Sequence, residues 1–219
     1  MTKVMQVMAG ARHGGAEAFF MRLVPTLARA GIEQRVAMRR HESRSARLRD
    51  AGLELNELRF GGWFDFATGP KLAHAIAEFA PDVVLAWMSR AARFCRTGDY
   101  VLVGRLGGYY DLKYYRHCDH LIANTNDIAD YMVNNGWPRE RTTYIPNFVD
   151  AAPTPAADRE AEDTPVDAPL LLALGRLHEN KAFDVLLDAM PDLPDAYLWI
   201  AGDGPLGDGL RQQAERLGI

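Results

Sequence analysis

Two adjacent glycines stand where a short apolar run gives way to a helical pattern. Lys3 to Met8 is the apolar run, and Gly14 and Gly15 precede a segment whose apolar side chains recur at helical spacing. Glycines have no Cβ, so backbone N–H groups there can approach a bound anion closely. The start of a helix adds partial positive charge at the same place. The pair is a candidate phosphate cradle, and a tight turn without a ligand is the alternative.

Two cations, Arg176 and Lys181, form a second candidate site. They lie five positions apart in a glycine-containing loop that follows the apolar run Leu170 to Leu174. Open α/β sheets bind their ligands at the carboxyl ends of strands. Arginine offers a planar fork for phosphate oxygens and lysine a compact charge. The loop is therefore suited to hold a phosphorylated ligand, and two solvated loop cations are the alternative.

Strands and helices alternate along the first part of the chain, which predicts a parallel sheet with helices on both faces. Pro25 is expected to kink or loosen the first helix. Apolar runs and helical periods predict strands over 3–8, 34–38, 53–58, 82–87, 101–103 and 120–123, and helices over 16–30, 43–51, 66–79, part of 106–117, and 125–134.

The alternation is interrupted once and then resumes. The segment 151–168 is rich in Ala, Pro and acids and has no apolar period, which is typical of a linker. Beyond it, strands are predicted over 170–174 and 197–201, with helices after each. We therefore expect a first domain over 1–150, a linker over 151–168 and a second α/β domain that starts at 169. Two strands do not make a stable doubly wound sheet alone, so the second domain is expected to be incomplete in 169–219.

These motifs, in this order, resemble those of glycosyltransferase family 4, the retaining enzymes of the GT-B fold. The resemblance spans nearly the whole chain. It is carried by His13-Gly14-Gly15-Ala16-Glu17, by Ile145-Pro146-Asn147-Phe148-Val149-Asp150, by Gly175-Arg176-Leu177-His178-Glu179-Asn180-Lys181 and by Ala201-Gly202-Asp203-Gly204-Pro205.

The resemblance implies two Rossmann-like domains of parallel sheet facing a cleft, the first on the acceptor side and the second binding a nucleotide sugar. It implies transfer of a sugar, with retention, from a nucleotide-diphosphate donor to a glycan or glycolipid, including acceptors of the lipopolysaccharide type. Arg176 and Lys181 would stabilise the diphosphate that leaves, in place of a metal. Gly14 and Gly15 would contact the donor phosphates. No metal and no further cofactor are expected.

The chain departs from the family's pattern in several places. Ala182 stands where a glycine is usual, and a methyl there requires a helical backbone angle. The usual histidine of the first domain is missing from Arg105–Asp111, so His13, Tyr109 and Asp111 are the candidates for sugar or acceptor contact. A glutamate pair eight positions apart, which holds the donor in the family, does not follow Gly204. The 219 residues alone are therefore expected to bind a donor weakly and to turn over little.

Charge is spread unevenly along the chain. Residues 1–49 hold ten Lys or Arg and three acids, whereas the whole chain has a net charge of −4. Arg39, Arg40 and Arg44 are therefore candidates to meet a phosphorylated acceptor, with loose contact to a membrane. Scattered solvated arginines are the alternative. A mildly acidic chain does not predict a nucleic-acid partner.

The composition is that of an ordinary globular protein, with 48% hydrophobic and 25% charged residues. Cys95 and Cys118 have the spacing of neither a zinc site nor a redox pair. They fit a reducing compartment, so we expect a cytoplasmic protein that can lie at the inner face of a membrane. The first residues lack the apolar stretch of a signal peptide, and no run approaches the length of a membrane span.

Three other functions remain open. A nucleotide-sugar epimerase on the same scaffold would need acid and base carboxylates and a histidine, and the Arg176–Lys181 loop favours transfer over it. An NAD-dependent oxidoreductase would need the spacing G-x-G-x-x-G, but Gly10 is followed by Gly14 and Gly15. A non-catalytic interaction domain is the third.

Overall fold

Strands with apolar residues on both sides build one parallel sheet in the first of two compact units. The computed structural model describes the chain except for residues 1, 12–13, 63–64 and 150–153, and it divides into Met1–Asp150 and Ala151–Ile219. Within the described part of the first unit, all strand pairs are parallel and the order is β3-β2-β1-β4-β5-β6-β7. The strands are β1 Lys3–Met8, β2 Glu33–Arg39, β3 Glu54–Leu58, β4 Val83–Trp87, β5 Val101–Leu106, β6 His120–Ala123 and β7 Thr142–Tyr144.

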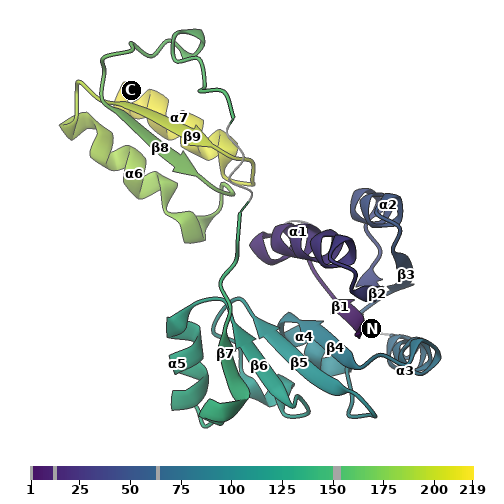
Figure 1. Ribbon diagram of the computed structural model, residues 1–219. Helices are drawn as coiled ribbons and strands as arrows, with labels where there is room; N and C mark the ends of the chain where they lie inside the picture. The colour runs from purple at the N-terminus through teal and green to yellow at the C-terminus, as the bar shows by residue number, and fades with distance from the viewer. Residues whose placement is uncertain (1, 12–13, 63–64, 150–153) are drawn as a thin grey trace. The chain divides into compact units, whose positions relative to one another are not determined.

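Helices cover both faces of this sheet because alternate strand residues point to opposite sides. Met5 and Val7 of β1 pack with α3, α4 and α5, whereas Met8 packs with α1 and α2. Strands buried on both faces in this way are typical of doubly wound folds. Figure 1 shows the helices around the sheet. They are α1 Gly15–Arg29, α2 Glu42–Asp50, α3 Thr68–Phe79, α4 Met88–Phe94 and α5 Asn126–Asn134.

The α/β class and parallel sheet predicted from the sequence are confirmed, with local differences. The helix expected within 106–117 is only a 3-10 turn, Leu112–Tyr115. The sequence analysis missed α4, whose seven residues are too few to display a helical period. α1 continues as one helix through Pro25. Other 3-10 turns are Arg139–Arg141, Glu160–Glu162, Glu179–Lys181 and Met190–Asp192.

A chain of buried amide groups ties α1 to the centre of the sheet. Trp87 Nε1 donates to Gln6 Oε1 at 2.8 Å, Gln6 Nε2 donates to Gln34 Oε1 at 2.9 Å, and Gln34 Nε2 donates to the carbonyl of Val24 at 2.9 Å. Gln6 is fully buried and Gln34 nearly so. Buried polar side chains of this kind are tolerated because each finds a partner. The network fixes the indole of Trp87 at the carboxyl end of β4.

Replacing Gln6 with leucine is expected to lower the free energy of unfolding by about 1–3 kcal/mol. The apolar side chain has a similar size but leaves the Trp87 N–H and the Gln34 carbonyl without partners, and each unsatisfied buried group is costly. Urea unfolding followed by tryptophan fluorescence measures the change. Wild-type stability in Gln6→Leu would show that the network contributes nothing.

The second unit has a smaller core built on two strands. β8 Leu170–Leu174 pairs in parallel with β9 Tyr197–Ala201, and α6 Phe183–Ala189 and α7 Gly207–Leu217 pack on them. Part of the segment predicted as a linker contacts this unit, since Arg159 donates to the carbonyls of Val166 and Ala168 and Trp199 Nε1 donates to Thr164 Oγ1 at 2.9 Å.

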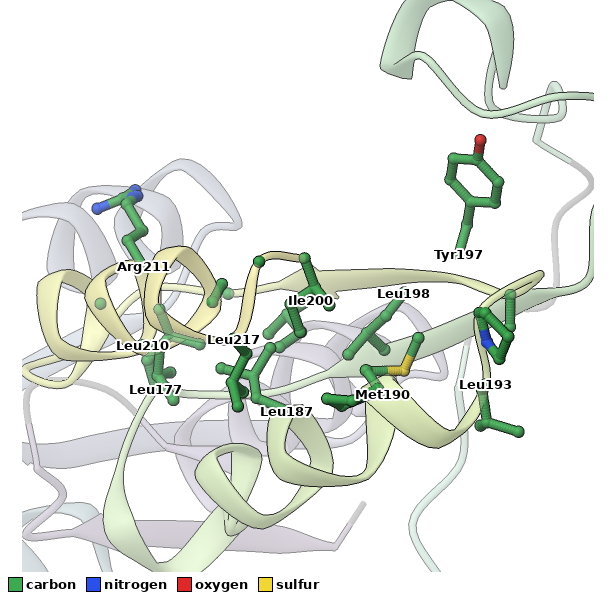
Figure 2. Close-up of a pocket in the computed structure, with 18 residues that line it drawn as sticks. Leu177, Leu187, Met190, Leu193, Tyr197, Leu198, Ile200, Leu210, Arg211 and Leu217 are labelled. Atoms are coloured by element: carbon green, nitrogen blue, oxygen red, sulfur yellow. The ribbon is translucent and has the colours of Figure 1, made fainter.

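An apolar hollow of about 830 Å³ opens between α6, β9 and α7. Figure 2 shows Leu187, Leu198 and Ile200 pointing into the space between these elements, whereas Tyr197 points away from it. Its lining is dominated by aliphatic side chains, so it offers few groups that could orient a polar ligand. Leu172 and Leu174 of β8 are also more than half exposed.

Candidate functional site

The glycine turn after β1 leads directly into the first turn of α1. A Cβ at Gly10 would lie 2.7 Å from Glu17 Oε1, and a Cβ at Gly14 would collide with the same carboxylate. Gly15 differs, because nothing lies within 4 Å of the position that its Cβ would take. A side chain at Gly10 or Gly14 would therefore force the buried Glu17 side chain to move. Gly15 is the one of the three whose backbone faces open space, as a phosphate cradle needs. His13 lies outside the described residues.

Glu17 and Arg44 hold this turn from behind. Glu17 Oε1 accepts from the backbone N–H of Ala11 at 2.6 Å, and the Arg44 guanidinium donates to the carbonyl of Ala11. Both side chains are buried. Burial lowers the pKa of Arg44, and the nearby Glu17 charge acts in the opposite direction. The structure therefore places Arg44, a predicted acceptor-side residue, in the support of the turn.

A hollow of about 380 Å³ lies in front of the turn, at the carboxyl ends of the central strands. β1 has β2 on one side and β4 on the other, so the connections leave it in opposite directions there. Ligands of open α/β sheets bind at such a switch point. The polar and aromatic lining comes from five separate segments and comprises Glu17, Phe19, Trp87, Arg105, Tyr110, Asn124 and Asn147.

Arg105 is the principal charge in this hollow. It ends the buried strand β5 and is only 5% exposed. Its Nη2 donates to Asn147 Oδ1 at 2.8 Å and to the carbonyl of Ile145 at 3.1 Å, and its guanidinium lies 4.8 Å from the centre of the Phe19 ring. Burial lowers the pKa of Arg105. No carboxylate forms an ion pair with Arg105 among the described residues, although Glu17 belongs to the same lining, so the Arg105 guanidinium itself is available to an anion.

Two further polar groups of the hollow could orient a ligand. Asn124 Oδ1 is buried and has no hydrogen-bond partner within the described part of the chain. Tyr110 is partly buried, and burial followed by the Glu17 charge raises its pKa, so the phenol stays neutral and can donate a hydrogen bond. Asn124 follows β6 and Tyr110 follows β5. Both are therefore held at the same edge of the sheet as the glycine turn.

Tyr109 and Asp111 do not line this hollow. Tyr109 is 64% exposed and its hydroxyl bonds the Asp127 carboxylate. Asp111 accepts from the Lys113 backbone N–H at 2.9 Å and pairs with Lys113 Nζ at 2.6 Å, which caps the 3-10 turn. Tyr110, the residue between them, takes the position that the sequence analysis assigned to its neighbours. The alternation of side chains along a strand could not show which of the three residues faces the hollow, because all three lie in a loop.

Arg39 and Arg40 lie at the carboxyl end of β2. Together with Gly10, Ala11 and the first turn of α2 they line a shallow hollow of about 630 Å³. Arg40 is exposed, whereas Arg39 is half-buried and donates to the carbonyls of Arg59 and Phe60 at 3.0 and 2.9 Å. Of the three predicted acceptor-side arginines, Arg40 is thus the most accessible.

In the second unit, the loop after β8 is held by the turn after β9. The N–H of Leu177 donates to the carbonyl of Asp203 at 3.0 Å, and the N–H of Leu206 donates to the carbonyl of Leu177 at 3.2 Å. A Cβ at Gly202 or Gly204 would collide with backbone atoms of this loop. Because Gly202 and Gly204 have no side chains, the turn after β9 packs directly on the backbone of the loop that carries Arg176. This contact holds the loop in place.

Arg176 and Lys181 are both exposed. The side chain of Lys181 returns over Gly175, with its Cε 3.7 Å from the position of a Cβ there. Neither cation has an ion-pair partner in the described residues of its unit. Glu179 lies in the same loop but forms an ion pair with neither cation in the described structure, so both charges are available to an anion.

Ala182 has a left-handed backbone, with φ of 51° and ψ of 37°, and therefore lacks the helical angle that would accept a methyl there. The left-handed region costs a non-glycine residue about 1–2 kcal/mol. Ala182→Gly is expected to raise the free energy of unfolding of this unit by about 0.5–1 kcal/mol, because part of the gain is lost to the greater entropy of unfolded glycine. Chemical unfolding measures it. Ala214→Gly, within the regular helix α7 of the same unit, is the control and should destabilise.

Sequence reasoning missed Arg105, Asn124 and Trp87 as members of the site. Arg105 carried a signal, since it is a charged residue at the end of an otherwise apolar strand. Asn124 and Trp87 also stand at strand ends, at positions where doubly wound sheets bind ligands. Only the strand order, which brings β1, β4, β5 and β6 together, identifies them as one group.

Comparison with known proteins agrees with this architecture. Residues 13–152 match the family model Glycosyltransferase Family 4, and residues 156–219 match Glycosyl transferases group 1. The lipopolysaccharide core biosynthesis glycosyltransferases LpsE and LpsD of Rhizobium meliloti are 36% and 35% identical over 95% and 99% of this chain. The chain spans 62% and 64% of the length of these two relatives.

Solved structures share the fold at low sequence identity. Anabaena HepE in complex with UDP-glucose superposes with a TM-score of 0.79 at 17% identity, covering 100% of this chain and 67% of its own. The lipopolysaccharide outer core galactosyltransferase WaaB superposes with a TM-score of 0.70 at 16% identity, again over 100% of this chain and 66% of its own. The family model covers well over half of the residues, and the strand order and motifs agree with it. The chain belongs to glycosyltransferase family 4 and has an α/β fold of the GT-B type.

Proposed function

We propose that the complete protein transfers a sugar from a nucleotide-diphosphate donor to a glycan or glycolipid acceptor, with retention of the anomeric configuration. The observation that carries the proposal is the Arg176–Lys181 loop. Its two cations form no ion pair among the described residues, and the loop is held by the glycine turn after β9. A nucleoside diphosphate is the leaving group whose growing charge such a pair can stabilise.

In this reaction the bond between the anomeric carbon and the diphosphate oxygen breaks, and a bond to the acceptor oxygen forms on the same face. The diphosphate departs with the electron pair, and its departing oxygen takes up the proton that the acceptor hydroxyl loses. Arg176 and Lys181 bind the departing oxygens, so the proposal needs no metal ion. The open backbone of Gly15 at the start of α1 is proposed to contact a donor phosphate.

The relatives support the classes of donor and acceptor. LpsE and LpsD are named for lipopolysaccharide core biosynthesis, and HepE was solved with UDP-glucose. We propose a uridine-diphosphate sugar as donor and a saccharide of lipopolysaccharide type as acceptor, met at a membrane surface. No helix in the described part of the chain is long and apolar enough to cross a bilayer.

The test is transfer of sugar from UDP- and GDP-sugars to a deacylated lipopolysaccharide core oligosaccharide by the complete protein. The anomeric proton coupling in the product reports the stereochemistry. We expect acceptor-dependent release of UDP and a product with the donor's configuration. Inversion would reject retention. Conversion of the donor sugar without an acceptor would favour the epimerase, and binding of NAD alone would overturn the proposal.

A further inference from the structure

Six cations line a second hollow of the first unit, which is separate from the hollow in front of the glycine turn. It measures about 940 Å³ and shares no lining residue with the hollow that contains Arg105. Its cations come from the end of β2, from α4 and the residues after it, and from the 3-10 turn Leu112–Tyr115 and its end. They are Arg39, Arg90, Arg93, Arg96, Lys113 and Arg116, and we call this site the basic hollow.

The positive charge of the basic hollow is only partly compensated by acids. Asp65 is the one acid among its lining residues, and its carboxylate is occupied by the backbone N–H groups of Gly61 at 2.6 Å and Thr68 at 3.0 Å. Lys113 is paired with Asp111. The five arginines have no ion-pair partner within the part of the chain that the structure describes. In a chain with a net charge of −4, such a concentration is not explained by overall composition.

Two of these arginines lie close enough to repel each other. Arg39 is fixed by its bonds to the carbonyls of Arg59 and Phe60, so its guanidinium cannot turn away. Burial lowers the pKa of Arg39, the charge of Arg90 lowers it further, and the Asp65 carboxylate acts in the opposite direction without cancelling them. Arranging like charges in this way is unfavourable unless an anion joins them, and an anion bound there would relieve the repulsion.

Aromatic rings form the apolar part of the lining. Phe60 is fully buried and lies edge to face with Phe94, their ring centres 5.6 Å apart, and Tyr114 lies at the same hollow. The volume is far larger than one inorganic anion needs and falls within the range of organic ligand sites. A mixed lining of cations and rings suits a ligand with an apolar sugar face and several negative oxygens.

We propose that the basic hollow binds a phosphorylated saccharide. This saccharide is the portion of the acceptor that carries its phosphoryl groups. This inference rests on the proposed transferase function and narrows its acceptor to phosphorylated glycans. The phosphoryl oxygens bind Arg90, Arg93 and Arg116, which are exposed. The sugar ring lies against Phe94 and Tyr114. Uncharged glycans lack the groups that these cations would hold.

The experiment measures binding rather than turnover. The complete protein is titrated in a calorimeter with the phosphorylated oligosaccharide of deacylated lipopolysaccharide, before and after its phosphates are removed with hydrofluoric acid. The variant Arg90→Gln/Arg93→Gln is compared with Arg22→Gln/Arg29→Gln, which removes two exposed arginines from α1 of the same unit. UDP binding is measured in each protein.

We expect Arg90→Gln/Arg93→Gln to weaken binding of the phosphorylated oligosaccharide at least tenfold, because charge-assisted hydrogen bonds are lost. The α1 control should stay within twofold of wild type, and UDP binding should not change. Equal binding of the phosphorylated and dephosphorylated forms would overturn the proposal. So would an equal loss in the control, which would indicate general electrostatic attraction.

A membrane surface is the remaining source of phosphoryl groups, and sedimentation with vesicles of phosphatidylcholine and phosphatidylglycerol separates it from the acceptor. If Arg90→Gln/Arg93→Gln loses vesicle binding while wild type never binds the soluble oligosaccharide, the hollow is a lipid site and the proposal is wrong. Because no step requires sugar transfer, failure of the proposed function would appear separately, as absent turnover by a protein that still binds the oligosaccharide.

Discussion

Replacing Arg176 with alanine in the complete protein is expected to lower kcat/KM for sugar transfer by about a hundred- to a thousandfold. Arg176 is exposed, and its loop is fixed by backbone contacts to Gly202, Asp203 and Gly204. Its charge is therefore available to a diphosphate without rearrangement of the protein. Removing one preorganised group that stabilises developing negative charge typically costs this much. Steady-state kinetics with a UDP-sugar and calorimetry with UDP measure the two effects.

The matched control is Arg216→Ala, which removes an exposed arginine from α7 of the same unit. It should leave kcat/KM within about twofold of wild type, as expected for a surface charge that makes no specific contact. Arg176→Lys should recover part of the activity, because it keeps the charge but loses the planar fork. An Arg176→Ala protein that retains wild-type kcat/KM would remove the main support for diphosphate stabilisation by this loop.

The strands of the first unit could be predicted because a strand that is buried on both faces must be apolar at nearly every position, and such a run is visible in the sequence. Val83 to Trp87 is apolar at every position, and β4 is buried on both faces between two helical layers. Helices with a clear period, such as α5, were predicted, and the structure shows that Thr125 Oγ1 caps α5 by accepting from the Ile128 N–H. α4 escaped prediction because seven residues span only two turns, and Met88 begins it with a left-handed φ of 63°.

The candidate site was predictable only where its residues are neighbours in the chain. Gly14 and Gly15, or Arg176 and Lys181, form local patterns whose chemistry can be read directly. Arg105 and Asn147 are 42 positions apart and meet because β5 and the segment after β7 end at the same edge of the sheet. The basic hollow has the same origin, since Arg39 ends β2 whereas Arg90 lies in α4, which follows β4. Composition indicated an excess of arginines but not which of them share a surface.

Arg44 shows how burial changes the meaning of a charge. In the sequence it belongs to a run of arginines that suggests an anionic partner. In the structure it is only 8% exposed and donates to the carbonyl of Ala11. A test of the acceptor side should therefore replace Arg39 and Arg40 and leave Arg44 in place, because loss of Arg44 would disturb the glycine turn and with it any donor contact.

The two glycines at the start of α1 are expected to respond to alanine in opposite ways. Gly15→Ala should fold with equal or greater stability, by up to about 1 kcal/mol, because its Cβ meets nothing within 4 Å and alanine favours a helix. Gly14→Ala should lose about 1–3 kcal/mol of stability, because its Cβ collides with the buried Glu17 carboxylate. Urea unfolding of both variants measures this difference.

Activity should show a different pattern from stability. If a donor phosphate rests on the backbone of Gly15, a methyl group there displaces it by about 1 Å, and a shift of that size can cost on the order of a hundredfold in rate. Gly15→Ala should therefore be stable and poorly active, with weakened UDP-sugar binding. A stable Gly15→Ala protein with wild-type kcat/KM and donor affinity would mean that the turn only joins β1 to α1 and cradles no phosphate.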